Sequence, residues 1–173
     1  MYDLKSIIAF RETRGRHRLV LDANLLVLLF IGYLDPEHIP NCGRLNAFVK
    51  SDYELLLKIL ENFEPEIVIT PHVLTELSNL SKRKMGLGDK KQAYFTMIVD
   101  KLKNFQEEHI PLSDLIGLDL NAVIRFGFSD LGVIEVAKKL GAIVLSNDFN
   151  MVEHALSQSI WAINFTNIRT AGV

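Results

Sequence analysis

Four acidic residues stand beside short apolar runs, and their types and positions suit metal-assisted chemistry. Asp22 ends the run in LVLDAN, Asp148 follows the run in AIVLSND, and Glu76 lies in the helical pattern after a third run, in IVITPHVLTEL. Asp130 opens the helical pattern that leads towards Asp148. Clustered carboxylates cannot all stay ionised without compensation, and oxygen-only ligands suit Mg²⁺ or Mn²⁺ rather than zinc. Such a site predicts phosphoryl chemistry, because the metal polarises a phosphate and activates water.

Each of these acidic residues also has a purely structural interpretation. Asp22 and Asp148 stand where a strand passes into a helix, and an Asp there is often only a helix cap. Asp130 could favour a helix N-terminus through the macrodipole, and Glu76 could be solvated. Taken together the structural interpretation weakens, because Asp22 interrupts an apolar strand end and must be solvated, paired or metal-bound.

Strands that alternate with helices must position these residues. Short apolar runs predict strands at 19–21, 67–69, 142–145 and 160–165. The first three runs are continuously apolar, as expected of strands buried on both faces of a parallel sheet. The alternation indicates an α/β fold with three α/β/α layers, a mainly parallel sheet of four or five strands, and one domain over 1–173. Sites in such folds form beyond the carboxyl ends of the strands, where we expect the carboxylates to converge.

Two of the expected helices have clear N-terminal patterns. Ser51 and Glu54 match a capping box ahead of a helix over about 52–62. Thr70 followed by proline predicts an N-cap and the first position of a helix over 71–80. The second helix would carry Glu76.

Two further helices are expected in the second half of the chain. Asp89 is expected to cap a helix that runs to about Glu107. Ser129 is expected to cap a helix over 130–140, which Gly141 would terminate. The last helix would start beside Asp130.

The segments that contain the four carboxylates carry a family resemblance. VLDANLLV, ITPHVLTEL and FSDLGVIEVAKKLGAIVLSNDFNM resemble, in order and spacing, the PIN domain, a family of metal-dependent nucleases. The resemblance implies that Asp22, Glu76, Asp130 and Asp148 are catalytic residues that bind one or two Mg²⁺ or Mn²⁺ ions. It also implies hydrolysis of RNA by water that attacks the phosphodiester in line.

Neighbouring polar residues match the family in part. Asn24 and Ser146 match positions that support the site in PIN domains, and Ser129 could orient a ligand, although capping its helix is the preferred interpretation. Family members often carry an acidic residue two positions after the last aspartate, where this chain has Asn150. That departure lowers the charge available to a second metal ion.

Basic residues gather in two short stretches. One contains Arg11, Arg14, Arg16 and Arg18, and the other contains Lys82, Arg83, Lys84, Lys90 and Lys91. A positive groove with aromatic stacking platforms is typical of proteins that bind single-stranded nucleic acid, so the second stretch is the candidate RNA-binding segment, with Tyr94 and Phe95 as platforms. Solvated surface charge is the alternative. Many small PIN nucleases resemble the toxin of a toxin–antitoxin pair, so an antitoxin protein is a further expected partner.

Composition excludes several protein classes. The 19 Lys and Arg residues nearly balance the 21 Asp and Glu residues, and a single cysteine, Cys42, excludes an intrachain disulfide framework. The longest apolar run, 19–31, falls short of the ~20 residues that span a bilayer. Neither a P-loop nor a dinucleotide-binding motif is present. We expect a soluble cytoplasmic protein, with a homodimer as the default oligomer.

Three functional hypotheses follow. The leading one is a Mg²⁺- or Mn²⁺-dependent endoribonuclease. The main alternative is a PIN-like module that binds RNA or a partner but has lost cleavage, which Asn150 would favour. The third is a phosphatase of the haloacid dehalogenase type, which requires a second Asp where this chain has Asn24.

Overall fold

The computed structural model describes residues 18–61, 66–82, 85–117 and 119–170. Its strands form one five-stranded parallel sheet in the order β3-β2-β1-β4-β5. The strands are β1 (Leu19–Leu21), β2 (Ile67–Ile69), β3 (Gln106–Glu107), β4 (Ile143–Ser146) and β5 (Ala162–Asn164). The α-helices are α2 (Ala23–Leu34), α3 (Lys50–Glu61), α4 (Pro71–Lys82), α5 (Lys91–Leu102), α6 (Leu112–Ile116), α7 (Leu120–Leu140), α8 (Phe149–Ser157) and α9 (Phe165–Thr170), and two short 3₁₀ helices are η1 (Pro36–Asn41) and η2 (Gly88–Lys90).

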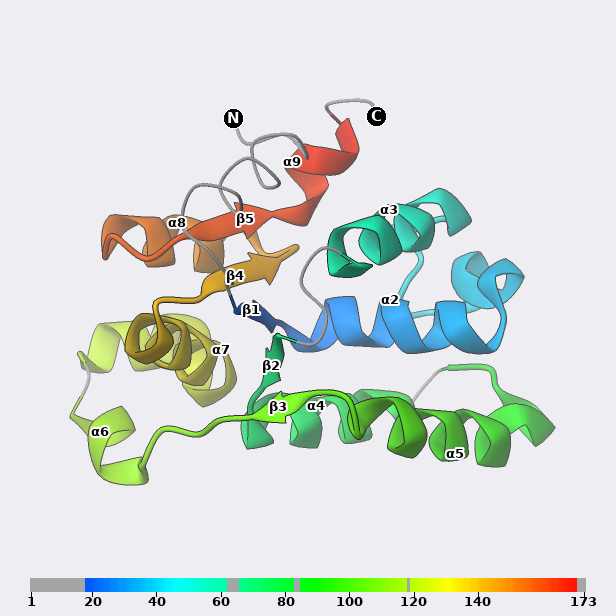
Figure 1. The fold of residues 1–173 in the computed structure, drawn as a ribbon, viewed down its shortest axis with the longest axis horizontal. Coiled ribbons are helices and arrows are strands. Elements are labelled where there is room, and N and C mark those ends of the chain that lie inside the picture. The colour runs from blue at the N-terminus through cyan, green and yellow to red at the C-terminus, as the bar shows by residue number, and fades with distance from the viewer. Residues whose placement is uncertain (1–17, 62–65, 83–84, 118, 171–173) are drawn as a thin grey trace.

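Helices flank both sides of the sheet. In Figure 1, α7 lies to one side of β1 and β4, and α2 and α3 lie to the other. The three central strands β1, β2 and β4 are fully buried, which explains their continuously apolar sequences. The predicted three-layer α/β/α fold with a parallel sheet is therefore confirmed.

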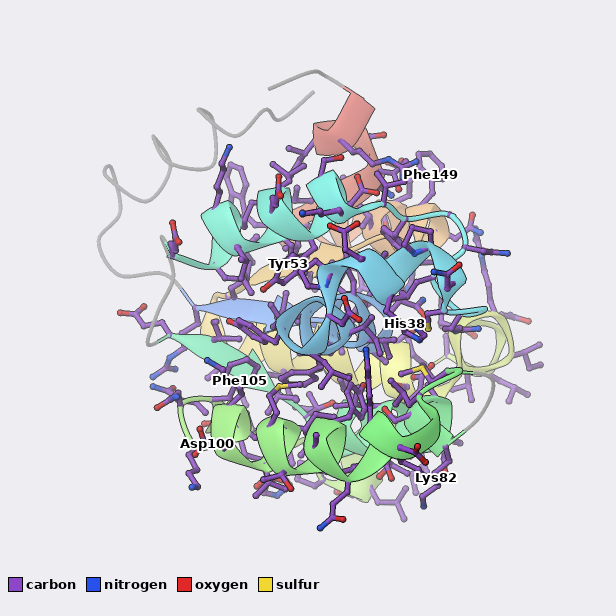
Figure 2. The ribbon with its side chains drawn as sticks, turned by 90° about the vertical axis from the view of Figure 1, so that its right-hand side faces the viewer. His38, Tyr53, Lys82, Asp100, Phe105 and Phe149 are labelled. Atoms are coloured by element: carbon purple, nitrogen blue, oxygen red, sulfur yellow. The ribbon has the colours of Figure 1, made fainter. Side chains whose placement is uncertain are left out.

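The α2 helix forms the centre of the molecule. Every residue from Leu25 to Ile31 is fully buried, as expected of a helix that is apolar all round. Figure 2 shows α2 end-on between α3 and α5, with Tyr53 and Phe105 labelled on the flanking segments. Gly32 permits the close approach of α3, because a Cβ atom there would lie 2.1 Å from Tyr53 Cδ2.

The first two expected helices form, but only one begins as predicted. Thr70 Oγ1 accepts a hydrogen bond from Val73 N at 3.2 Å, which confirms the N-cap of α4. The Ser51 capping box was wrong, since α3 already begins at Lys50. Asp52 Oδ2 instead accepts a hydrogen bond from Val49 N at 2.8 Å. The acidic residue that hydrogen-bonds back to the start of the helix is therefore Asp52 and not the expected Glu54.

The helix expected to run to Glu107 ends earlier. Asp89 lies in η2, and α5 starts at Lys91 without a side-chain cap. The chain leaves the helix after Leu102 and then forms β3, which pairs with β2. Both residues of β3 are exposed and polar, so the sequence carries no strand pattern there.

The α7 element consists of two helical segments that meet at a kink, and the second segment corresponds to the helix predicted over 130–140. The element begins at Leu120, and Gly127 adopts φ 75° and ψ 173° within it, a conformation that favours glycine. Gly141 ends the helix in the left-handed region, as expected. None of the described helices is long and apolar enough to cross a membrane.

Candidate functional site

Asp22 is a buried carboxylate at the end of β1. Its Oδ1 accepts a hydrogen bond from Leu25 N at 2.8 Å and so caps α2. Its Oδ2 accepts from Ser146 Oγ and, at 3.2 Å, from Asn147 N. These donors come from the end of β4, which pairs in parallel with β1 through Leu21 and Leu145. The adjacent strand ends therefore meet at this carboxylate.

The environment of Asp22 resists ionisation. The side chain is only 5% exposed, and burial raises its pKa from 3.8 to about 6. The hydrogen bonds from Ser146, Leu25 and Asn147 lower the pKa and partly offset burial, whereas the nearby Glu76 carboxylate raises it further. Asp22 is thus both a helix cap and a carboxyl group whose ionisation is disfavoured by its surroundings.

Asp148 caps the next helix at the same edge of the sheet. Its Oδ1 accepts from Met151 N at 3.0 Å, and its own backbone N donates to Ser146 Oγ at 2.9 Å. Ser146 therefore connects the two aspartates through one hydroxyl group. The structural interpretation of Asp22 and Asp148 is confirmed, since both residues cap helices, whereas their catalytic role stays a prediction.

Glu76 is held in place by Ser129. The Ser129 hydroxyl donates to Glu76 Oε2 at 2.8 Å across the α4–α7 contact. The prediction that Ser129 caps its helix was wrong, because Gly127 is the non-helical residue before the second helical segment of α7 and the Ser129 hydroxyl donates to Glu76. The Ser129 hydroxyl instead holds the Glu76 carboxylate of the candidate site in place.

The packing of α4 against α7 is close. Gly132 faces His72, and a Cβ atom at Gly132 would lie 3.2 Å from His72 Nδ1. This buried nitrogen has no hydrogen-bond partner among the residues that the structure describes. The small residue on α7 thus lets the helix that carries Asp130 approach the helix that carries Glu76.

Asp130 is partly buried among the other acidic residues. Burial is the largest cause that raises its pKa from 3.8 to about 7, and the carboxylates of Asp22, Glu76 and Asp148 each raise it further. The four predicted residues therefore lie near enough to interact electrostatically. Among the described residues, the charged groups that shift Asp130 are all carboxylates.

The donor chemistry of this cluster fits a hard divalent cation, because all four side chains offer oxygen. Within the described ranges, however, no group of three or more His, Cys, Asp or Glu side chains is already arranged around one metal position. Hydrogen bonds from Ser146, Ser129 and Met151 occupy part of the carboxylate surface. Like charges also keep apart without a cation between them.

Two arginines that sequence reasoning missed adjoin the site through asparagines. Asn24 Oδ1 accepts from Arg44 Nε at 3.1 Å and from Arg44 Nη2 at 2.8 Å. Asn150 Oδ1 accepts from Arg125 Nη2 at 3.3 Å. Arg44 comes from the segment after η1 and Arg125 from α7. Nothing in the sequence pattern connects either arginine to the carboxylates, since only tertiary folding brings these segments together.

The basic stretch around 82–91 is only partly described. Lys82 is exposed at the end of α4 (Figure 2), and Lys91 is exposed at the start of α5. Lys90 Nζ pairs with Asp35 Oδ2 at 2.8 Å, so a neighbouring carboxylate offsets its charge. Arg83 and Lys84 lie outside the described residues, as do Arg11, Arg14 and Arg16 of the other stretch.

Tyr94 cannot serve as the expected stacking platform. Its side chain is fully buried, its hydroxyl hydrogen-bonds with Ser81 at 3.1 Å, and burial raises its pKa to about 12. Phe95 is half-buried and packs edge-on against Tyr94, with ring centroids 5.5 Å apart. Exposed aromatic residues occur instead near Asp130 and Asp148 in the sequence, where Phe128 is 47% exposed and Phe149 is 60% exposed.

Comparisons with known proteins find a distant structural likeness. No protein-family model matches the chain, and no curated protein matches it. Among solved structures, the chain is similar to a domain of a functionally unknown protein from Methanocaldococcus jannaschii DSM 2661. The two are 18% identical with a TM-score of 0.44, and the match covers 86% of this chain and 90% of that one. A likeness of this size assigns neither a family nor an activity.

Proposed function

We propose that the protein is a Mg²⁺- or Mn²⁺-dependent endoribonuclease that cleaves RNA phosphodiester bonds. The observation that carries the proposal is the gathering of four carboxylates beyond β1 and β4, where hydrogen bonds from Ser146 and Ser129 hold Asp22 and Glu76, and where the other carboxylates add to burial in raising the pKa of Asp130. Four carboxylates that oppose one another's ionisation form a site whose charge a divalent cation would neutralise. The PIN-like order of the same residues supports RNA as the substrate.

The protein's own groups would hold this site in a defined orientation. Ser146 and the backbone N–H groups of Leu25 and Asn147 fix both oxygens of Asp22. Ser129 fixes Glu76 from a separate helix. When bound by these carboxylates, Mg²⁺ or Mn²⁺ would supply charge neutralisation for the phosphate and a more acidic water. Side chains locked by such hydrogen bonds lose little mobility when a ligand arrives.

A module that binds RNA without cleaving it is the second candidate. It is favoured by the hydrogen bonds that already engage Asp22, Glu76 and Asp148, and by Asn150, whose amide oxygen is used by Arg125. Under this alternative the carboxylates would be structural. The role of toxin in a toxin–antitoxin pair stays a prediction.

Asp130→Asn is the most informative test of cleavage. Asp22→Asn would place an amide NH₂ group where Asp22 Oδ2 accepts from Asn147 N, which would disturb the fold as well as the site. Asp130 carries no capping role, so its neutral isostere removes charge with less structural change. A matched control is Asp100→Asn, which alters an exposed carboxylate on α5.

The assay follows end-labelled RNA with Mg²⁺, Mn²⁺ or excess chelator. The nuclease proposal expects metal-dependent fragments from the wild type and Asp100→Asn, with activity at least about 100-fold lower in Asp130→Asn, comparable to the loss of one electrostatic stabiliser. Full cleavage by Asp130→Asn or in chelator would refute the proposed site. RNA binding with no cleavage under any condition would favour the non-cleaving module.

A further inference from the structure

The two asparagines that follow the capping aspartates are used in the same way. Asn24 is two residues after Asp22 in α2, and Asn150 is two residues after Asp148 in α8. Each amide oxygen accepts a hydrogen bond from an arginine of another element, namely Arg44 or Arg125. The same local arrangement thus occurs beside both aspartates of the adjacent strands β1 and β4.

Both arginines keep their charge and most of their donors. A guanidinium has five N–H donors, of which Arg44 uses two and Arg125 one in these bonds. Both side chains are exposed. Among the described residues, neither forms an ion pair with a carboxylate, although Arg125 also lies 5.0 Å from the Phe126 ring centroid.

Asn24 and Asn150 hold the two arginines without neutralising their charge. An aspartate at 24 or 150 would hold the same arginine more tightly and would cancel its charge. Asparagine oxygen instead orients the guanidinium and leaves its charge for an anion. Arginine is well suited to phosphate because its planar donors can bind two phosphate oxygens at once.

We propose that Arg44 and Arg125 bind the RNA backbone phosphates on either side of the cleaved bond, and that Asn24 and Asn150 position them. The inference rests on the proposed function, because it assigns the substrate contacts of the same site. The strand ends of β1 and β4 place one Asn–Arg pair beyond Asp22 and the other beyond Asp148. Each arginine is therefore held by the asparagine that follows a different aspartate of the cluster.

An exposed ring beside one pair favours nucleic acid over other anionic polymers. Phe149 lies between Asp148 and Asn150 in sequence and is 60% exposed. Figure 2 shows it at the periphery of the molecule. Stacking on an aromatic ring next to a bound phosphate is typical of single-stranded nucleic acid recognition.

Asn150 also gains a role that separates this inference from loss of a metal ligand. If Asn150 only marks a weakened metal position, Asn150→Asp should strengthen metal binding and increase cleavage. If Asn150 is a neutral anchor, Asn150→Asp should neutralise Arg125 and weaken RNA binding to about the level of Arg125→Gln. The two interpretations therefore predict opposite changes for one substitution.

The experiment measures RNA binding and cleavage separately in the full chain. Single-stranded RNA oligonucleotides are titrated with the wild type, Arg44→Gln, Arg125→Gln, Asn150→Asp and the control Lys103→Gln, whose exposed lysine directly follows α5. Each lost phosphate contact should reduce the slope of log K against log salt by about 0.7. It should raise KM about tenfold with a smaller change in kcat, as expected for loss of a charged hydrogen bond.

The outcomes distinguish this inference from the proposed function. A reduced salt slope in the Arg44 and Arg125 variants, with an unchanged Lys103→Gln, supports it. A wild type that binds and cleaves RNA, with unchanged KM and salt slope in both arginine variants, overturns this inference alone. A wild type that binds no RNA overturns both. Circular dichroism and thermal unfolding of each variant identify any loss of binding that follows from misfolding.

Discussion

Ser146 donates its hydroxyl to Asp22 across the junction of the adjacent strands β1 and β4. The same oxygen accepts the backbone N–H of Asp148. One small side chain therefore orders the two aspartates that begin α2 and α8. Its removal should affect both stability and any ligand that these carboxylates bind.

Ser146→Ala should destabilise the protein by about 1–3 kcal/mol, because it leaves buried polar groups without a partner. Since the Ser146 hydrogen bond lowers the pKa of Asp22, its loss should raise that pKa further. The destabilisation should therefore be greater at pH 8, where Asp22 is ionised, than at pH 5. Urea unfolding at both pH values measures it. Ser157→Ala is the control, because it removes an exposed serine that donates only to His154 O. An equal loss for both serines would contradict the assigned role of Ser146.

The pH dependence of stability should carry the signature of raised carboxyl pKa values. The pKa of Asp22 is raised to about 6 and that of Asp130 to about 7, from 3.8. Between about pH 4 and 7 the folded state then binds more protons than the unfolded state, so these groups lower the unfolding free energy as pH rises. For Asp22, the change from 3.8 to about 6 corresponds to about 3 kcal/mol.

Urea unfolding of the wild type and Asp130→Asn across pH 4–8, in chelator, isolates the contribution of Asp130. The variant should gain stability relative to the wild type as pH rises through this window. The control Asp100→Asn should track the wild type, because it lies outside the carboxylate cluster on α5. A constant difference between Asp130→Asn and the wild type would show that the Asp130 carboxyl is not stressed in the folded state.

The close contact of Gly32 with Tyr53 should be measurable as a coupling. Gly32→Ala places a methyl group 2.1 Å from Tyr53 Cδ2, so it should overpack the α2–α3 contact and cost about 1–3 kcal/mol. Tyr53→Ala alone should cost about 3–5 kcal/mol through the cavity it leaves. In the double variant the methyl enters that cavity, so the combined loss should be smaller than the sum. Strict additivity in thermal or urea unfolding would contradict the packing at this contact.

The central strands could be predicted because a strand that is buried on both faces requires a continuous apolar run in the sequence. That signal identified β1 and β2 with their bounds as observed. The exposed strand Gln106–Glu107 has no such signal, since its backbone pairs with β2 while its side chains face solvent. The helical pattern therefore led to the wrong prediction that the helix continues to about Glu107, whereas α5 ends at Leu102.

The candidate site also contains residues that the sequence pattern could reveal and residues that it could not. Asp22 and Asp148 could be found because each follows an apolar strand, where a charged residue stands out. Arg44 and Arg125 could not, because their relation to Asn24 and Asn150 exists only after distant segments pack together. Ser129 was assigned to the wrong partner for a similar reason. A serine before a helical pattern resembles a cap, and only the packing of α4 on α7 reveals Glu76 as its acceptor.

Divalent cations that bind the carboxylate cluster should stabilise the folded protein. Binding to the folded state alone raises the unfolding free energy by mass action, and it should release protons from Asp22 and Asp130, whose raised pKa values leave them partly protonated near neutral pH. Thermal unfolding with Mn²⁺ or Mg²⁺ should therefore show a Tm increase that chelator reverses and that grows from pH 6 to pH 8. Asp130→Asn should abolish most of this increase, whereas Asp100→Asn should retain it. Calorimetric titration of Mn²⁺ in two buffers of different ionisation enthalpy should detect the released protons. A Tm insensitive to both metals at pH 8, with no heat of binding, would leave the carboxylates as structural groups and favour the non-cleaving module.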